Sequence, residues 1–356
     1  MEKEAAPRAA RRRREAAILF IWARKNADRP ARHRRADGSA KLEIMSFGDV
    51  PTPRGGNRLT YGKAQQRTKE PMRIGTCLHE GRARIVRDDG DRLVLLPEGF
   101  ASGVRALIAD RRLGEAAAVA GTPVEPSSLT FLPPVTDPDK IIAVGFNYRG
   151  HLIETGTPLP DYPSLFVRFP SSQVGHGQPV VAPSLSGEFD FEGELAVIIG
   201  RPAWRVAEAD AMDHVVGYSC FAENSVRDYQ AHARQVTAGK NFLASGAIGP
   251  WLTTADEVGD PSTLELTTRL NGAVVQQDRL TSLIFTIPQL IAYITRFTRL
   301  LPGDIISTGT PDGVGFLRDP KIWLAPGDVL EIDIPRVGLL RNAVVAEGAG
   351  ASGAGA

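Results

Sequence analysis

Cysteine is scarce in this sequence. Only Cys77 and Cys220 occur among its 356 residues, and no Cys-x-x-Cys pair is present. A small disulfide-stabilised scaffold needs several paired cysteines, and a thiolate zinc site needs cysteines at close spacing. We therefore expect neither of these, and the cytoplasm is the default compartment.

Long hydrophobic runs are also missing. No apolar stretch approaches the roughly 20 residues that a membrane-spanning helix requires. The most apolar stretch, residues 283–297, is interrupted by Pro288, Gln289 and Arg296. We therefore expect no membrane-spanning helix and no membrane partner.

The main part of the chain has no excess of positive charge. The formal net charge of +1 combines two unlike segments, because residues 1–71 contain 18 Lys and Arg against 8 Asp and Glu, and residues 72–356 contain 24 against 33. This acidic balance excludes a strongly basic nucleic-acid-binding domain for the main body.

Residues 1–71 differ from the rest of the chain in composition. They contain the run Arg11–Arg14 and little periodic apolar pattern. We expect a basic, disordered extension, and a basic arm that touches RNA or anionic lipid is the alternative. The acidic residues near its start argue against an organellar presequence. A regular pattern opens at Met72, which is therefore a candidate start codon, and the Gly- and Ala-rich residues 346–356 are expected to form a flexible tail.

Short strands and turns are expected over residues 72–135. Strand-like segments lie at residues 72–78, 82–86 and 92–96, and brief helical segments lie near residues 103–111 and 113–120. We expect a small N-terminal α+β module that ends at the proline-rich segment 133–138. The main body would then span residues 136–345.

The main body is expected to be rich in strands. The strand-like segments are residues 140–145, 164–169, 189–199, 214–221, 264–270, 305–306 and 329–334. Asn271-Gly272 is a strong signal for a type I′ hairpin turn, and one helix is expected from about Pro288 to Phe297. Because strands outnumber helices and do not alternate regularly with them, a doubly wound sheet is not expected.

Carboxylates are the strongest candidates for chemistry. In a strand over residues 189–199, Asp190, Glu192 and Glu194 would share one face. The two glutamates would start about 6.5 Å apart and repel each other by about 2.5 kcal/mol at an effective dielectric constant near 20. If the strand enters a core, the pair needs a counter-ion, and oxygen-rich sites suit Mg²⁺, Mn²⁺ or Ca²⁺. A solvated polar face on an edge strand is the alternative.

Glu223 is a candidate for a third carboxylate. It follows the apolar segment 214–221 and precedes a polar run. Asp228 competes with it for this role, although the adjacent Arg227 suggests a local ion pair with Asp228 instead. A lone glutamate in a polar loop is usually solvated.

His151 and Glu154 form a candidate acid–base pair. Their i, i+3 spacing places them side by side in a helical turn. A carboxylate next to an imidazole raises its basicity and fixes its tautomer, as a general base requires. A His–Glu pair on a surface turn is the alternative reading.

Other motifs are less specific. Lys240 would normally lie on the surface, and the backbone N–H groups of residues 308–311 could meet an anion. The chain lacks a P-loop, a complete dinucleotide fingerprint, an HExxH motif and a GxSxG elbow.

Six blocks in sequence order resemble the fumarylacetoacetate hydrolase family. They are Val144-Gly145-Phe146-Asn147-Tyr148 with His151 and Glu154, Phe191-Glu192-Gly193-Glu194-Leu195, Gly217-Tyr218 through Glu223 to Arg227-Asp228-Tyr229-Gln230, Gly239-Lys240-Asn241-Phe242 leading to Gly249-Pro250-Trp251, the Asn271-Gly272 hairpin, and Thr308 to Gly315. The similarity spans roughly residues 72–345. It implies an α+β, β-rich fold, namely a mixed β-sandwich roll, usually as a homodimer.

The resemblance also implies roles for individual residues. It makes Glu192, Glu194 and Glu223 the ligands of a divalent cation such as Mg²⁺, and His151 with Glu154 the general-base pair. It places Lys240 at the reacting part of the substrate, and Arg168, Gln230 and Thr310 as further residues that face the substrate.

The sequence departs from the family pattern at three positions. The family most often has Asp at the position of Glu223, often has Lys at that of Arg168, and often has Asp at that of Leu243. These three positions are expected near the site, so the resemblance does not determine which substrate the protein binds.

The activity implied by the resemblance is hydrolysis of a C–C bond. The substrate would be an acylpyruvate-type 2,4-dioxo acid, and the products pyruvate (or a related 2-oxo acid) and a carboxylic acid. Isomerisation, hydration or decarboxylation of 2-oxo acids from aromatic or sugar catabolism is the nearest alternative, because it uses the same metal–enolate chemistry. A non-catalytic oxo-acid-binding protein and a purely structural protein are the more remote alternatives.

Overall fold

The computed structural model describes residues 72–349, which belong to one compact unit. The predictions for residues 1–71 and for most of the tail lie outside the described residues. Within residues 72–349, no helix is both long and apolar enough to cross a lipid bilayer.

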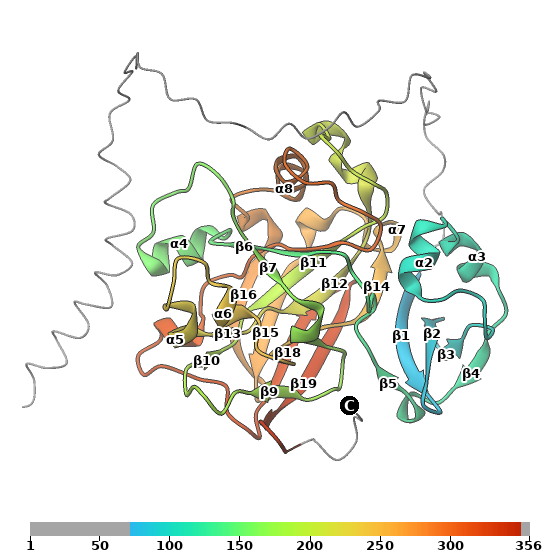
Figure 1. Cartoon of the computed structure of the whole chain (residues 1–356), viewed down its shortest axis with the longest axis horizontal. Coiled ribbons are helices and arrows are strands. Elements are labelled where there is room, and N and C mark those ends of the chain that lie inside the picture. Colours follow the sequence, from blue (N-terminus) through green and yellow to red (C-terminus); the bar gives the residue numbers. More distant parts are fainter. Residues whose placement is uncertain (1–71, 350–356) are drawn as a thin grey trace, which may run out of the picture. The chain divides into compact units, whose positions relative to one another are not determined.

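Strands make up most of the regular structure (Figure 1). They are β1 (Arg73–His79), β2 (Arg82–Asp88), β3 (Leu93–Leu95), β4 (Thr122–Val124), β5 (Thr130–Phe131), β6 (Ile141–Gly145), β7 (Ser164–Arg168), β8 (Gln173–Val174), β9 (Val180–Ala182), β10 (Phe189–Asp190), β11 (Gly193–Ile199), β12 (Val215–Ala222), β13 (Ser225–Val226), β14 (Gly246–Thr254), β15 (Glu265–Leu270), β16 (Ala273–Arg279), β17 (Ile305–Ser307), β18 (Val329–Ile334) and β19 (Gly338–Ala346).

The helices are short. They are α2 (Val104–Ala109), α3 (Leu113–Ala118), α4 (Arg149–Thr155), α5 (Arg227–Gln230), α6 (Thr237–Lys240), α7 (Ala255–Val258) and α8 (Ile287–Ile294). Single 3₁₀ turns are η1 (Pro126–Ser128), η2 (Pro170–Ser172), η4 (Pro261–Thr263), η5 (Leu280–Ser282) and η6 (Gly315–Leu317), and η3 (Glu208–His214) is longer.

The strands form two large sheets and a short ribbon. The larger sheet has the order β4-β3-β2-β1-β14-β12-β11-β17-β6-β7, with β5 beside β1 and β8 beside β14, and the five-stranded sheet has the order β16-β15-β18-β19-β9. Most pairs are antiparallel, but β17 pairs with β6 in parallel, as do β14 with β8 and β19 with β9. The predicted β-rich α+β fold with mixed sheets is confirmed.

Strand β11 lies at the centre of this arrangement, and all seven of its residues are buried. Its side chains alternate, so Leu195 and Val197 pack into one apolar cluster, while Ala196 and Ile198 pack into the other. A strand covered on both faces reads as a continuous apolar run, which is the pattern of Leu195 to Ile199. The glutamates at the start of β11 are therefore next to the core.

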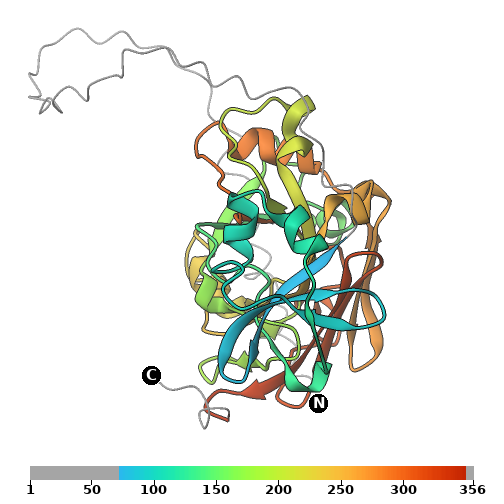
Figure 2. The ribbon, with the colours of Figure 1, turned by 90° about the vertical axis from the view of Figure 1, so that its right-hand side faces the viewer.

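The N-terminal module continues the larger sheet. Strand β1 pairs with β14, with Ile74 opposite Leu252. Figure 2 shows β1 together with the helices of the module on this side of the molecule. One apolar cluster contains Leu107 from α2 together with Ile198 and Phe221 from β11 and β12. The proposed boundary near residue 135 falls between β5 and β6, and the domain division remains a prediction.

Two local predictions are confirmed. Asn271 and Gly272 have φ values of 52° and 82°, which are the left-handed conformations that a type I′ turn requires. The predicted helix 288–297 is α8, and a capping box between Thr286 and Gln289 starts it. The helix is shorter than predicted, since it ends at Ile294 and leaves Phe297 exposed.

The continuous strand predicted over residues 189–199 is wrong. The chain breaks after Asp190, where β10 pairs with β13 in a separate ribbon, and β11 begins only at Gly193. Asp190 therefore does not share one regular strand face with the two glutamates. It pairs instead with Arg227 and accepts hydrogen bonds from the N–H groups of Gly315 and Phe316.

Candidate active site

Three glutamates meet where β11 and β12 lie side by side. Glu192 precedes β11, Glu194 is its second residue, and Glu223 follows β12. The Glu223 N–H donates to the Glu192 carbonyl at 2.8 Å, which aligns the two strand ends. One oxygen from each carboxylate lies within 4.8 Å of the others, and the three residues are 5%, 1% and 0% exposed. The alternative of a solvated edge strand is therefore wrong.

Each carboxylate has its own set of donors. Glu192 Oε1 accepts from Ser225 Oγ at 2.6 Å. Glu194 Oε2 accepts from Ser307 Oγ at 2.6 Å and from the Gly309 N–H at 2.8 Å. The anion predicted to meet the backbone of residues 308–311 is thus the carboxylate of Glu194. These contacts fix the three carboxylates with oxygen atoms facing one another.

Lys240 and two arginines compensate part of this charge. Lys240 Nζ bridges Glu192 Oε2, at 3.2 Å, and Glu223 Oε2. Arg168 Nη1 lies 2.8 Å from Glu223 Oε1, and Arg227 Nη2 lies 2.6 Å from Glu192 Oε1. Among the described residues, no lysine or arginine forms an ion pair with Glu194.

The pKa values reflect this uneven compensation. Although burial raises the pKa of Glu192, Arg227 and Lys240 lower it to about 2. Burial and the neighbouring carboxylates of Glu223 and Glu192 raise the pKa of Glu194 well above its usual value. Burial also raises the pKa of Glu223, against the lowering effect of Lys240 and Arg168.

A divalent cation fits this donor set. A buried cluster of three carboxylates, one of them without a cationic partner, is costly unless a further positive charge is present. Carboxylate oxygens are the ligands that Mg²⁺, Mn²⁺ and Ca²⁺ prefer. Glu192, Glu194 and Glu223 are thus the residues that could hold such an ion.

His151 and Glu154 form the predicted pair on α4. His151 Nδ1 lies 3.2 Å from Glu154 Oε2, and His151 is 8% exposed. The other carboxylate oxygen of Glu154 accepts from the Gly313 N–H at 3.1 Å. The ring of Phe146 is stacked on the imidazole, with ring centroids 5.7 Å apart. Burial, Arg227, Lys240 and Ser225 have the larger effects on the pKa of Glu192, and His151 is the last of the groups near enough to lower it.

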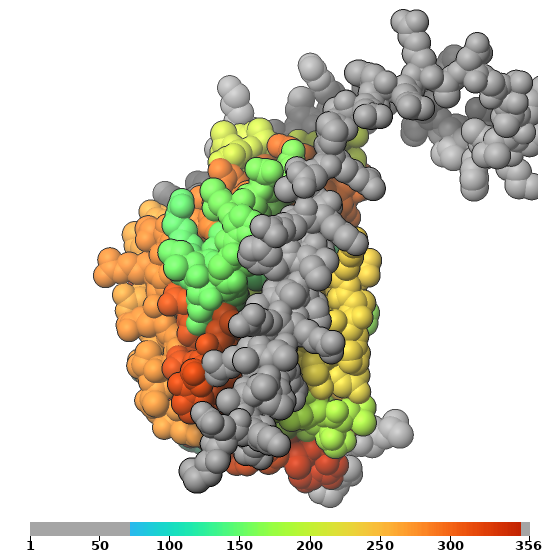
Figure 3. Space-filling model, turned by 90° about the vertical axis from the view of Figure 1, so that its left-hand side faces the viewer, coloured from blue at the N-terminus to red at the C-terminus, as the bar shows by residue number. Residues whose placement is uncertain are grey.

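Helix α4 lies at the surface. Ile153, on the same helix, is 82% exposed. Figure 3 shows the green segment around residues 150–165 at the surface of this side, next to the orange-red segment around residues 310–320. The acid–base pair therefore belongs to a surface helix, with His151 among its buried residues.

The residues predicted to face the substrate are distributed differently. Arg168 is 2% exposed and uses its guanidinium on Glu223, on the Asn224 carbonyl at 3.0 Å and on Ser245 Oγ at 3.1 Å. Gln230 accepts from Arg227 Nη1 at 2.9 Å, so it is linked to the carboxylates through that arginine. Thr310 is 5% exposed.

Two of the three family departures lie together. Glu223 and Arg168 form a direct ion pair. Both partners of this contact are therefore longer than the Asp and the Lys that the family often has at these positions. The third departure, Leu243, is 73% exposed, whereas Glu223 and Arg168 are buried.

Arg227 is the site residue that the sequence analysis missed. The expected local pair with Asp228 is wrong, because Arg227 pairs with Asp190 and Glu192 while Asp228 accepts from Ser186 Oγ at 2.7 Å. The block that resembles the family contains Arg227 without giving it a role, and sequence proximity favoured the wrong carboxylate.

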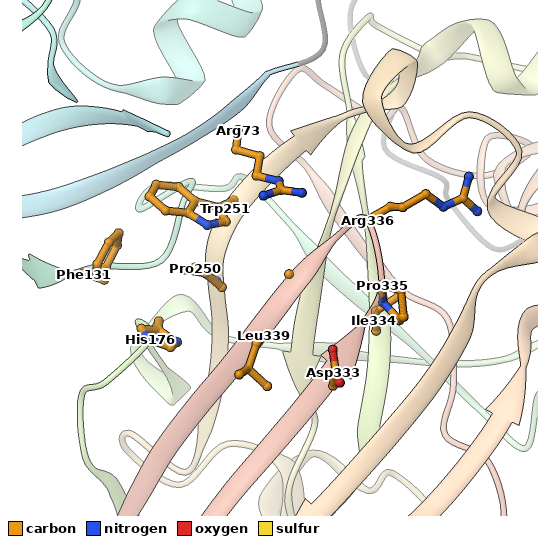
Figure 4. A pocket seen from close by; sticks show the side chains of 11 residues that line it. Arg73, Phe131, His176, Pro250, Trp251, Asp333, Ile334, Pro335, Arg336 and Leu339 are labelled. Atoms are coloured by element: carbon orange, nitrogen blue, oxygen red, sulfur yellow. The ribbon is translucent and has the colours of Figure 1, made fainter. Parts of the chain in front are cut away.

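A cavity of about 470 Å³ lies elsewhere, between β1, β14 and the hairpin of β18 and β19 (Figure 4). Its lining includes Arg73, Phe131, His176 and Trp251, and none of the predicted site residues lines it. The concentration of buried charge, and not this cavity, therefore marks the candidate site.

Known proteins match this chain in sequence. The family described as fumarylacetoacetate (FAA) hydrolase C-terminal matches residues 140–345. The human protein named oxaloacetate tautomerase FAHD2A, mitochondrial, is 42% identical over 232 residues, which are 64% of this chain and 74% of the relative.

Solved structures are similar over most of the described residues. A 5-carboxymethyl-2-hydroxymuconate delta-isomerase from Mycobacterium smegmatis is 31% identical with a TM-score of 0.64, and the match covers 78% of this chain and 100% of that chain. A maleylpyruvate hydrolase from Sphingobium sp. SYK-6, in complex with manganese(II) and pyruvate, is 31% identical with a TM-score of 0.65, and the match covers 77% and 99%. With its strand-rich fold, its buried glutamates and these matches, the chain belongs to the fumarylacetoacetate hydrolase family of enzymes.

Proposed function

We propose that this protein is a divalent-metal-dependent enzyme that interconverts the keto and enol forms of a 2-oxo acid of the oxaloacetate type. The observation that carries the proposal is the His151–Glu154 pair beside three buried glutamates and Lys240. The human relative named as an oxaloacetate tautomerase, at 42% identity, supports this substrate class.

Glu192, Glu194 and Glu223 would hold the cation, and we propose Mg²⁺ or Mn²⁺ in this place. When bound, such an ion supplies Lewis acidity toward the carbonyl and carboxylate oxygens of a 2-oxo acid. The manganese(II) in the related maleylpyruvate hydrolase supports the choice of ion class.

The chain's own residues would then move the proton. His151 takes a proton from the carbon next to the substrate carbonyl, and Glu154 holds the imidazole in the tautomer that accepts it. The C–H bond breaks and its electron pair forms the C=C bond of the enolate, the enolate oxygen takes a proton from water to give the enol, and His151 returns its proton to the hydroxide that is left. Lys240 adds positive charge next to the site, which favours the negative charge that develops on the enolate.

Hydrolysis of an acylpyruvate to pyruvate and a carboxylic acid is the second candidate. The maleylpyruvate hydrolase relative, in complex with pyruvate, favours it. In this reaction, His151 would take the proton from a water molecule that attacks the distal carbonyl. The predicted homodimer and the cytoplasmic location stay predictions.

The two candidates differ in their products. Purified protein with Mn²⁺ is mixed with the enol form of oxaloacetate, and the loss of enol ultraviolet absorbance is followed. A second assay measures pyruvate released from acylpyruvates. We expect faster loss of the enol than with Mn²⁺ alone, and we expect His151→Ala to lower this rate by about 10²–10⁴-fold.

Each outcome has a clear meaning. Pyruvate release without enhanced tautomerisation would establish the second candidate in place of the first. If the folded, Mn²⁺-loaded protein enhances neither reaction, the proposed function is wrong. Ile153→Ala is the matched control on α4, because that exposed side chain points away from the protein interior.

A further inference from the structure

A closed ring of hydrogen bonds holds Gly193, the residue between Glu192 and Glu194, through the two peptide units on either side of its Cα atom. The Gly193 N–H donates to Gln276 Oε1 at 3.0 Å, and Gln276 Nε2 donates to Thr310 Oγ at 2.8 Å. Thr310 Oγ in turn donates to the Gly193 carbonyl at 3.0 Å. Both backbone polar groups of Gly193 are thus held by side chains from other elements.

The ring is buried and fully satisfied. Gln276 is 2% exposed, and its second amide hydrogen bonds to the Pro311 carbonyl at 3.0 Å. The amide of Gln276 therefore uses its acceptor and both of its donors, which leaves no alternative orientation with the same bonds. A buried network of this kind rigidifies the groups that it connects.

The hairpin of β15 and β16, which carries Gln276, also packs closely against Gly193 through Thr268. Thr268 on β15 is the cross-strand partner of Gln276 on β16. A Cβ atom at Gly193 would lie 2.0 Å from Thr268 Oγ1, so only glycine allows this approach. The pairing of β15 and β16 also has an irregular register after Thr268, as is common next to functional sites.

This geometry determines how the neighbouring carboxylates are presented. Gly193 lies directly between Glu192 and Glu194, where the chain has just left β10 and is entering β11. The Glu192 carbonyl already accepts from the Glu223 N–H, and the ring adds the restraints on the N–H and the carbonyl of Gly193 that fix the direction of the chain between the two glutamates.

We infer that Gln276 and Thr310 are positioning residues of the metal centre, which hold the Gly193 peptide so that Glu192 and Glu194 face the same ion. The inference rests on the proposed function for the presence of that ion. It replaces the expectation that Thr310 faces the substrate, because the hydroxyl of Thr310 is used within the ring.

Thr310 offers the sharpest test, because two substitutions separate its hydroxyl from its shape. Thr310→Val removes the hydroxyl at nearly equal volume, and Thr310→Ser keeps it. Gln276→Leu removes the amide. Gln277→Leu is its matched control, since the neighbouring Gln277 is exposed and its side chain bonds only to Glu265 among the described residues.

Two measurements are made on each variant. Titration calorimetry with Mn²⁺ gives metal affinity, and we expect Thr310→Val and Gln276→Leu to weaken it by roughly 10–100-fold, as for other residues that orient metal ligands. Amide hydrogen exchange on the metal-free proteins follows the peptide that contains Gly193, and we expect faster exchange in the same two variants. Thr310→Ser and Gln277→Leu should match the wild type in both.

The outcomes separate this inference from the proposed function. Unchanged exchange at Gly193 and unchanged Mn²⁺ affinity in Thr310→Val would overturn the inference. If the KM of that variant is raised as well, the expectation that Thr310 faces the substrate would hold instead. If the wild type binds no Mn²⁺, the proposed function fails, and the exchange data still decide whether the ring holds the peptide. If Gln276→Leu does not fold, the Thr310 pair supplies the answer.

Discussion

Glu194 carries the least compensated charge of the candidate metal centre. Both of its hydrogen bonds reach Oε2, from Ser307 and Gly309, and no hydrogen bond from the described residues reaches Oε1. Glu192 and Glu223 share Lys240 and have one arginine each, so their charges are better balanced.

Glu194→Gln is therefore expected to change stability and metal affinity in opposite directions. The amide oxygen can keep both donors of Oε2, and the amide nitrogen would then face the other two carboxylates and donate to them. We expect Mn²⁺ binding to be lost. At a pH where Glu194 is ionised, we expect the metal-free variant to unfold at a higher temperature than the metal-free wild type, by about 2–4 °C for each kcal/mol gained. Calorimetry and thermal unfolding check these results. Glu98→Gln, at an exposed surface pair, should change neither, and a lower unfolding temperature for Glu194→Gln would contradict the charge argument.

The same residue gives the metal-free protein a pH dependence. The pKa of Glu194 is raised above its usual value, first by burial and then by Glu223 and Glu192. The native state therefore keeps a proton that the unfolded state loses at about pH 4.5. As the pH rises from about 4.5 toward the raised pKa of native Glu194, the free energy of unfolding falls. We expect this slope to be weaker in Glu194→Gln, as measured by thermal unfolding from about pH 5 to about pH 8. Equal slopes in both proteins would show that other groups cause the dependence.

At the scale of elements, the turn between β6 and α4 brings the acid–base pair to the carboxylates. Asn147 fixes this turn, because its side chain bonds to both the N–H and the carbonyl of Phe285 and to the Thr308 carbonyl. Phe146 has a φ of 56°, a left-handed conformation that is strained for a bulky residue. The turn tolerates this strain while the ring of Phe146 stacks on His151.

Phe146→Asn separates the strain from the stacking. Asparagine adopts left-handed backbone conformations more readily, so we expect no loss of thermal stability. The loss of a ring contact worth about 0.5–1.5 kcal/mol should lower kcat by about 2- to 10-fold, because the imidazole is less well held. Steady-state kinetics and thermal unfolding measure the two effects. Phe297→Asn, at a ring that is 59% exposed, is the control, and full activity of Phe146→Asn would show that the ring does not orient His151.

At the scale of the whole described unit, the N-terminal module and the main body share one apolar cluster. Leu107 of α2 is completely buried in the same cluster as Ile198 and Phe221. The sheet also runs without interruption from β1 to β14 and β12. We therefore expect both parts to unfold together.

Leu107→Ala tests this coupling. A buried leucine-to-alanine change costs about 2–5 kcal/mol, and we expect the single unfolding transition of residues 72–349 to move as a whole. Differential scanning calorimetry of the wild type and the variant shows this directly. Leu159→Ala, at a 66% exposed position, should leave the transition in place. Two separate transitions, with only one of them shifted, would show that the module is an independent domain.

The sequence alone was sufficient for those features that depend on local pattern. The apolar run of Leu195 to Ile199 predicted a buried strand, and the Asn271-Gly272 pair predicted its turn, because both signals lie in neighbouring residues. The i, i+3 spacing of His151 and Glu154 likewise predicted that they meet, since a helical turn alone brings them together.

Only the tertiary structure could decide the rest. Arg227 pairs with Asp190 and Glu192 and not with its neighbour, and Gln276 on β16 reaches Gly193 across 83 positions of sequence. A polar residue on a strand reads as a surface residue until a second sheet is known to cover it. The physical reason is that hydrogen bonds and ion pairs depend on distances in space, and strand pairing sets those distances between residues that are far apart in the chain.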